Sequence, residues 1–296
     1  MKKCLIIAVV ISLFAVTGCG KVEDKKTGKI NVFTSILPQK YFVERIGGER
    51  VNVSVLVGPG KSPATYEPLP EQVIDLSRAD IFFTIGVAFE KSFIPKISSS
   101  LKTLKIVDTS VGIKRRTIEH HDHGPDDGET GEHESRMPDP HIWMSVLLVK
   151  KQALNIYTAL SEADPENKDL YKNNYENFIS DLDKIYAELK KTLAPFRGST
   201  LFVFHPAFGY FADEYGLNQV AIETGGKEPA PSELESIIKK AKSEKVRIIF
   251  VQPEFSRKSA NAVARAIGGA VVILNPLDPD YMNNILHIAS EVKKAF

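Results

Sequence analysis

Histidine is the residue type with which this chain could do chemistry, and two of its seven histidines have unusual neighbours. His141 lies in Asp139-Pro-His-Ile-Trp-Met-Ser145, directly before an apolar segment with helical spacing. Pro140 restricts its own φ and biases the preceding residue towards an extended conformation, so His141 is fixed where a turn enters a helix. His205 directly follows a run of four apolar residues that reads as a strand. Both imidazoles are candidate metal ligands, and a hydrogen-bonded turn or core histidine is the alternative in each case.

Four further histidines crowd one short acidic segment, residues 119–134, which contains seven carboxylates and no large apolar side chain. They are His120, His121, His123 and His133. A segment of this composition cannot bury a core, and its imidazoles and carboxylates suit loosely held divalent metal. We predict an auxiliary metal-binding loop here. A charged, solvated loop without a metal role is the alternative.

The amino terminus has the pattern of a secretory signal. Two lysines precede an apolar run over residues 5–16, which is shorter than the roughly 20 residues of a membrane-spanning helix, so residues 1–18 read as a signal peptide. The run ends in Thr-Gly-Cys19, which resembles a bacterial lipobox and implies cleavage before Cys19 and lipid attachment to its sulfur. An ordinary signal peptide with an incidental cysteine is the alternative. Residues 19–29 are charged and small, as in a flexible tether.

Cysteine content and net charge limit the kinds of metal site and of partner that the chain can have. Cys4 would be removed and Cys19 acylated, so no thiol remains for a disulfide or a metal thiolate, and a metal site must use His, Asp or Glu. Removal of residues 1–18 takes away two lysines and no acids, which leaves 36 basic and 37 acidic residues. A near-neutral chain gives no electrostatic reason to expect a nucleic-acid partner.

The elements that must position these residues alternate between strand and helix. In the first half, short strands are expected over 30–34, 51–57, 81–85 and 104–108, with helices over 38–46, 70–78 and 88–98. In the second half, strands are expected over 201–204, 218–222, 247–251 and 270–274, with helices over 207–215, 232–242, 256–268 and 281–296. This α/β alternation predicts mostly parallel sheets covered by helices on both faces, in two βα-sandwich lobes. Ligands bind at the carboxyl ends of such strands, where His205 is expected to lie.

One long helix separates the two series. After a helix over 146–163, apolar residues recur at steps of three and four on one helical face: Tyr171, Tyr175, Phe178, Leu182, Ile185, Leu189 and Leu193. We predict a single rigid helix over 165–194, about 45 Å long, that joins an N-terminal lobe (30–164) to a C-terminal lobe (195–296). Ser232-x-x-Glu235 matches a capping box at the start of a later helix.

Five segments resemble one family, the lipoprotein substrate-binding components of bacterial zinc and manganese ABC importers. They are Gly58-Pro-Gly-Lys-Ser-Pro-Ala-Thr-Tyr-Glu-Pro68, Asp139-Pro-His-Ile-Trp-Met-Ser145, Phe204-His-Pro-Ala-Phe-Gly-Tyr-Phe211, Val251-Gln-Pro-Glu-Phe-Ser256 and Asn275-Pro-Leu-Asp-Pro-Asp-Tyr281. The resemblance implies two lobes joined by a rigid helix, one metal ion in the cleft between them, and a monomer that serves an ABC permease and its ATPase. It implies an extracytoplasmic location, in the periplasm or at the cell surface, with a lipid anchor in the membrane.

The resemblance also implies a ligand set. His141 and His205 match the second and third ligands, and Asp280 matches the carboxylate often supplied near the carboxyl terminus. A histidine at position 205 and an acidic His-rich loop are zinc-type features, so Zn²⁺ is expected ahead of Mn²⁺. The family's usual first histidine is replaced by Ala64. Glu67 and Glu223 are candidate fourth groups, with water or a loop histidine as alternatives.

Two other classes of function compete with transport. A metal-dependent hydrolase would need an open coordination position, but the chain has no His-Glu-x-x-His, Gly-x-Ser-x-Gly or Walker motif. We therefore expect no enzymatic activity. A surface adhesin or metal-buffering lipoprotein without a permease would share most of these sequence features.

Overall fold

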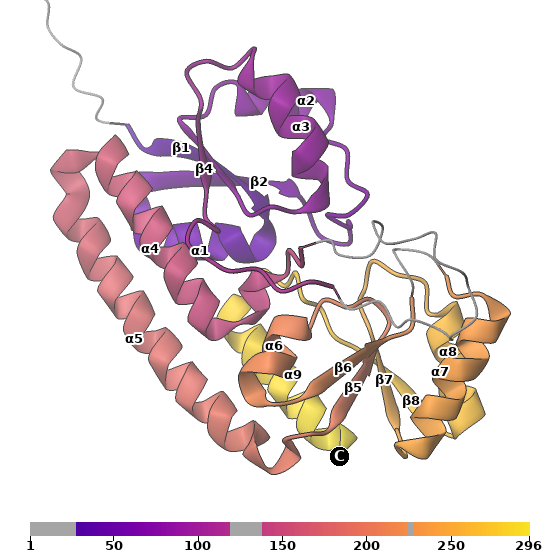
Figure 1. Ribbon diagram of the computed structural model, residues 1–296. Helices are drawn as coiled ribbons and strands as arrows, with labels where there is room; N and C mark the ends of the chain where they lie inside the picture. The colour runs from indigo at the N-terminus through magenta and orange to yellow at the C-terminus, as the bar shows by residue number, and fades with distance from the viewer. Residues whose placement is uncertain (1–27, 119–137, 224–227) are drawn as a thin grey trace, which may run out of the picture.

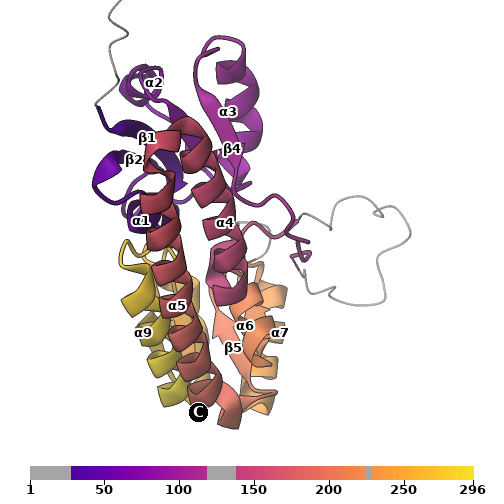
Figure 2. The same cartoon turned by 90° about the vertical axis from the view of Figure 1, so that its left-hand side faces the viewer.

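The computed structural model describes residues 28–118, 138–223 and 228–296. The signal peptide, Cys19 and the four histidines of the predicted loop lie outside these ranges. The described chain forms two α/β lobes, one above the other, with helix α5 (Lys168–Leu193) running along the side of both (Figures 1 and 2). The predicted fold class is therefore confirmed.

The N-terminal lobe is built on four parallel strands, β1 (Ile30–Ile36), β2 (Val51–Val57), β3 (Ile81–Thr84) and β4 (Lys105–Asp108), in the order β2-β1-β3-β4. Its helices are α1 (Leu37–Gly47), α2 (Pro70–Leu76) and α3 (Ala88–Ser98). All four residues of β3 are buried, because helices cover the sheet on both faces.

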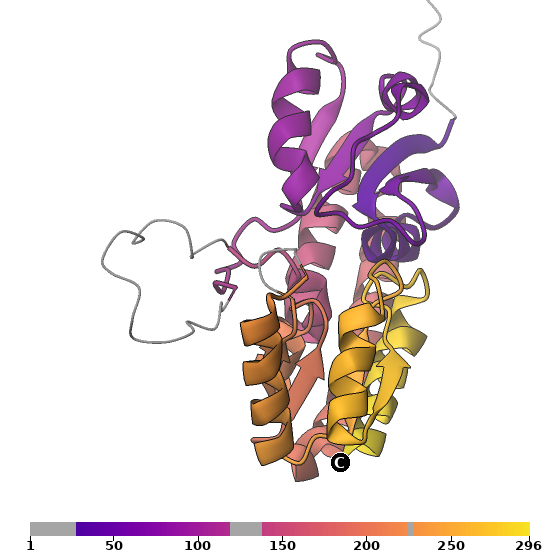
Figure 3. The same ribbon diagram turned by 90° about the vertical axis from the view of Figure 1, so that its right-hand side faces the viewer.

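The C-terminal lobe repeats this pattern. Strands β5 (Thr200–Val203), β6 (Asn218–Ala221), β7 (Ile248–Val251) and β8 (Ala270–Ile273) are parallel and lie in the order β6-β5-β7-β8. Its helices are α6 (Gly209–Tyr215), α7 (Pro231–Ser243), α8 (Lys258–Ile267) and α9 (Tyr281–Ala295). Helices α6 and α9 lie on the side of α5, whereas α7 and α8 cover the opposite face (Figures 1 and 3).

The strand order of each sheet indicates at which point of its edge a ligand is expected to bind. From the first strand of each lobe the chain goes to one neighbour and then crosses to the other side, so the order reverses between β1 and β3 and between β5 and β7. The carboxyl ends of the two strands at such a reversal are the usual ligand-binding position in parallel α/β sheets. His205 comes two residues after β5 and therefore lies at this position.

Helices α4 (Val146–Ala163) and α5 pack against each other and against α1, and α5 also packs against α9. Of the seven apolar residues that predicted α5, six are fully buried, while Tyr175 is half-buried and stacks on Tyr157. The helix has 26 residues, about 39 Å, and is shorter than predicted because residues 165–167 and 194–196 form tighter 3₁₀ turns. Its stripe contributes to a core that is continuous from β1 to α9.

The predicted capping box at Ser232 and Glu235 is wrong. Helix α7 begins one residue before Ser232, at Pro231, and the Glu233 carboxylate accepts a hydrogen bond from the Ala230 N–H at 2.7 Å. Proline occupies the first helical position, where its missing N–H costs nothing. In the described ranges, no helix is both long and apolar enough to cross a membrane.

Candidate metal centre

The turn that carries His141 is built by its own sequence. Asp139 Oδ1 accepts a hydrogen bond from the His141 backbone N–H at 2.9 Å and also lies 2.7 Å from the ring nitrogen Nδ1. The next three residues form a buried 3₁₀ turn, Ile142–Met144, that leads into the capping residue of α4, Ser145. The His141 side chain is thus fixed from both sides along the chain, and only 7% of the residue is exposed.

His205 is held at the carboxyl end of β5 by the neighbouring strand. The Gln252 side chain, just past β7, accepts a hydrogen bond from the His205 N–H at 3.1 Å and donates one to the His205 carbonyl at 2.7 Å. The imidazole stacks on Phe255, with 4.9 Å between ring centroids and 22° between planes. Its Nδ1 lies 2.7 Å from Glu223 Oε1, at the end of the strand on the other side.

The structure brings the two predicted histidines together although 64 residues separate them. Their Nε2 atoms lie 3.3 Å apart. Two nitrogen ligands at about 2.05 Å from one tetrahedral zinc ion also lie about 3.3 Å apart. The pair therefore has the spacing of two ligands of a single ion.

The opposite ring nitrogens face buried carboxylates, Asp139 at 1% exposure and Glu223 at 6%. An ionised carboxylate can only accept a hydrogen bond, so each Nδ1 donates, and a neutral ring held in this way has its lone pair on Nε2. The two lone pairs then point towards the same space, where a cation or a shared proton stabilises them. Carboxylates in this position orient metal-binding histidines and raise their basicity.

The ionisation of the neighbouring groups favours metal binding. Burial opposes ionisation of Asp139, but hydrogen bonds from the His141 ring and backbone N–H, together with the nearby Arg116 guanidinium, outweigh it and lower the pKa of the carboxyl. Burial lowers the pKa of His205, against the opposing hydrogen bond to Glu223, so this imidazole is neutral at neutral pH. A neutral imidazole is the form that binds metal.

The other predicted ligands are not gathered around this pair. Asp280 is exposed at the start of α9, where its carboxylate accepts hydrogen bonds from the backbone and side chain of Asn283. Glu67 and Ala64 are also exposed. Within the described ranges, no three His, Cys, Asp or Glu side chains are arranged to hold a metal ion. The roles of Asp280 and Glu67 as ligands stay predictions.

Sequence reasoning missed the residues that orient the histidines. Gln252 and Phe255 lie in a segment that resembles the family, and they follow a strand adjacent to the one before His205. Their place after a predicted neighbouring strand was the feature from which their proximity to His205 could have been predicted. Glu223 was predicted as a candidate ligand, but its Oε1 contacts the far side of the His205 ring from His141. Its other oxygen, Oε2, is buried and has no hydrogen-bond partner among the described residues.

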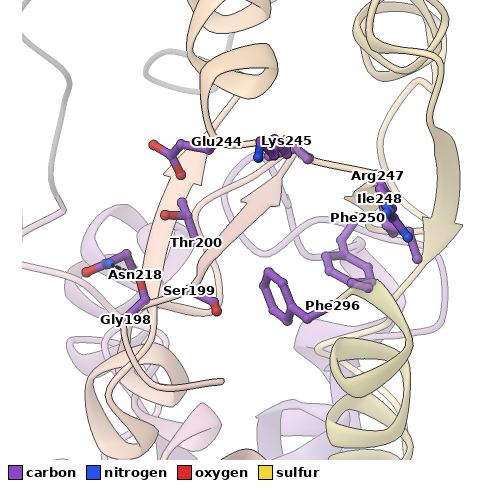
Figure 4. Close-up of a pocket in the computed structure, with 12 residues that line it drawn as sticks. Gly198, Ser199, Thr200, Asn218, Glu244, Lys245, Arg247, Ile248, Phe250 and Phe296 are labelled. Atoms are coloured by element: carbon purple, nitrogen blue, oxygen red, sulfur yellow. Dashed lines mark hydrogen bonds between the residues drawn. The ribbon is translucent and has the colours of Figure 1, made fainter. Parts of the chain in front are cut away.

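A hollow of about 510 Å³ lies elsewhere, at the amino-terminal edge of the second sheet (Figure 4). Its lining includes Thr200, Asn218 and Arg247, at the beginnings of three strands, and Phe296. His205 follows the opposite end of β5. The hollow is therefore separate from the histidine pair.

Comparison with known proteins shows the family of the chain. The profile of the family described as zinc-uptake complex component A, periplasmic, matches residues 32–295. The chain belongs to this family. The high-affinity zinc uptake system protein ZnuA of Bacillus subtilis (strain 168) is 30% identical over 284 residues, which cover 89% of the chain and 85% of that protein.

A curated lipoprotein and a solved structure are also similar to the chain over most of its length. The zinc-binding lipoprotein AdcA of Streptococcus pneumoniae (strain ATCC BAA-255 / R6) is 31% identical over 289 residues, which cover 94% of the chain. The chain spans about half the length of the AdcA relatives, 56% in this case. A crystal structure of ZnuA has a TM-score of 0.83 and 38% identity, and it covers 90% of the chain and 99% of its own. The family resemblance drawn from the sequence motifs is confirmed.

Proposed function

We propose that this protein binds zinc outside the cytoplasm and delivers it to an ABC importer. The observation that carries the proposal is the histidine pair, with Nε2 atoms 3.3 Å apart and each Nδ1 on a buried carboxylate. The names of the relatives, a zinc uptake protein and a zinc-binding lipoprotein, agree with this chemistry. A solved ZnuA deletion variant with zinc bound is 37% identical, with a TM-score of 0.81.

In this proposal His141 and His205 bind the ion, while Asp139 and Glu223 orient the two rings. Asp280 or water completes the coordination; the Asp280 carboxylate accepts hydrogen bonds from Asn283 and keeps further lone pairs. Nitrogen ligation and the Irving–Williams order both favour zinc over manganese. A transport protein must also release its ion, and a site with few protein ligands suits release.

We propose further that Cys19 carries a lipid anchor and that the partners are a permease and its ATPase. The protein would act as a monomer and without catalysis. The His-rich segment 119–134 would collect additional zinc ions weakly. Membership of a substrate-binding family favours this view over a hydrolase or an adhesin.

The test is native mass spectrometry of the demetallated protein lacking residues 1–19, titrated with zinc and manganese in separate and mixed samples. We expect one tightly retained zinc ion, which manganese does not displace, and further weak zinc equivalents. Equal retention of the two metals would contradict a zinc importer component. Failure to retain any ion would contradict the whole proposal.

A further inference from the structure

The helix that follows the His141 turn is capped by the other lobe. Glu214 lies in α6 of the C-terminal lobe, and its carboxylate accepts hydrogen bonds from the backbone N–H groups of Val146 and Leu147, at 3.1 and 3.3 Å. It also contacts the Ser145 hydroxyl, which in turn accepts from the Leu148 N–H. The first N–H groups of a helix have no partner within the helix, and a carboxylate stabilises them through hydrogen bonds and the helix dipole.

The capped helix end is connected to His141 by a short, rigid segment. Ser145 is connected to His141 only by the 3₁₀ turn of Ile142, Trp143 and Met144, whose residues are at most 1% exposed. Within the turn, the Met144 N–H donates to the His141 carbonyl at 3.0 Å. A close-packed turn cannot absorb movement of its end. A shift of Ser145 is therefore passed on to the His141 ring.

Two more contacts fasten the same turn to the C-terminal lobe. The Tyr210 hydroxyl of α6 donates to the Asp139 carbonyl and accepts from the Arg116 N–H, both at 3.0 Å. The Trp143 indole donates to the Pro276 carbonyl at 2.8 Å. His141 precedes the connecting helix in the chain, yet its turn is bonded to the lobe that carries His205.

Helix α6 follows His205 closely in the chain and contacts the turn that carries His141. It begins at Gly209, four residues after His205, and both Tyr210 and Glu214 lie in it. The helix that starts beside one ligand therefore bonds to the turn of the other.

We propose that Glu214 is a positioning residue for the metal site, which sets the spacing of the His141 and His205 imidazoles by capping α4. The inference rests on the proposed function and adds a residue that touches neither the ion nor its ligands. Loss of the carboxylate would free Ser145 and the first turn of α4. His141 would then drift from the 3.3 Å spacing, and zinc would keep one imidazole instead of two.

The test compares Glu214→Ala and Glu214→Gln with the unmodified chain. The matched control is Glu233→Ala, because Glu233 also caps a helix of the C-terminal lobe, α7, but within the described ranges it makes no hydrogen bond or ion pair with the histidine turn or with His205. Zinc affinity is measured by chelator competition, and X-ray absorption at the zinc edge counts the imidazoles bound. Thermal unfolding of the metal-free proteins reports stability separately.

We expect Glu214→Ala to weaken zinc binding about tenfold and to lower the imidazole count from two to one. Glu214→Gln, which keeps an acceptor oxygen, should recover part of both losses, and Glu233→Ala should change stability only. Unchanged affinity with two imidazoles in Glu214→Ala would overturn the inference. If that variant does not fold, full affinity with two imidazoles in Glu214→Gln would overturn it, because the amide should recover only part of the loss. Absence of zinc binding in the unmodified chain would instead overturn the proposed function.

Discussion

Substitution of His205 by alanine tests the metal site most directly. The pair offers two imidazole nitrogens at tetrahedral spacing, so the variant keeps only half of the nitrogen ligation. We expect zinc affinity to fall at least tenfold, or about 1.4 kcal/mol. His141→Ala should have a similar effect. Because the two rings serve one ion, the losses should not add in the double variant.

The assay is competition for zinc against a chromophoric chelator, with His287→Ala as the control. His287 lies on α9, where its side chain is 57% exposed and its Nδ1 is 3.9 Å from Glu291 Oε1. His205→Ala also leaves the Glu223 carboxylate buried without its partner, which costs about 1–3 kcal/mol of stability. Circular dichroism must therefore show that the variant is folded at the assay temperature. Equal zinc affinity in both single variants and the control would refute the assignment of the site.

Four other outcomes are expected. Glu223→Gln should weaken zinc binding about 10–100-fold if the carboxylate only orients the ring, and loss of all tight binding would identify it as a ligand instead. Ala64→His should tighten zinc binding about tenfold if a coordination position is open, and no change in calorimetry would mean that another side chain fills it. Asp280→Asn should cause a milder loss of zinc affinity than His205→Ala, since the amide keeps one weak oxygen donor. An equal loss would mean that Asp280 contributes as much to zinc binding as His205. Burial raises the pKa of Glu90 from 4.5 to about 7, against hydrogen bonds from Ser35 and two backbone N–H groups. Between these values the folded state holds a proton that the unfolded state has released, so the unfolding free energy should fall by about 3 kcal/mol as pH rises from 4.5 to 7. Denaturant titrations should show this fall, and Glu90→Gln should remove it.

Much of the fold could be predicted from the sequence, because it follows from local patterns. The apolar stripe of α5 predicted the helix, its buried face and its role as a connector. The predicted ends of the helix were wrong by only a few residues. Alternation of strands and helices gave both sheets. Prolines were the main source of error. Pro165 and Pro231 each start a helical segment, but the first starts a 3₁₀ turn and the second moves the start of α7 ahead of Ser232.

The site could be predicted only in part. His141 and His205 were candidates because each lies where the chain leaves a turn or a strand, which is a local property, and the structure brings the two rings together. Their role as metal ligands stays a prediction. Their partners were not found, because a glutamate at position 223 has no local feature that shows which face of an imidazole it will meet. Sequence also could not show that Asp280 would face Asn283, three residues ahead, since both are polar residues at a helix start.

The single tryptophan of the chain provides an intrinsic fluorescence probe of the candidate site. The Trp143 ring lies 5.1 Å from the His141 ring, is 1% exposed, and donates its indole N–H to Pro276. Its emission therefore comes from one place, next to a candidate ligand and across the contact between the lobes. An ion that withdraws charge from the neighbouring imidazole, or a movement that breaks the bond to Pro276, would alter that emission. Under the proposed function, metal binding and release would change this emission and could be followed in stopped-flow experiments without any attached dye.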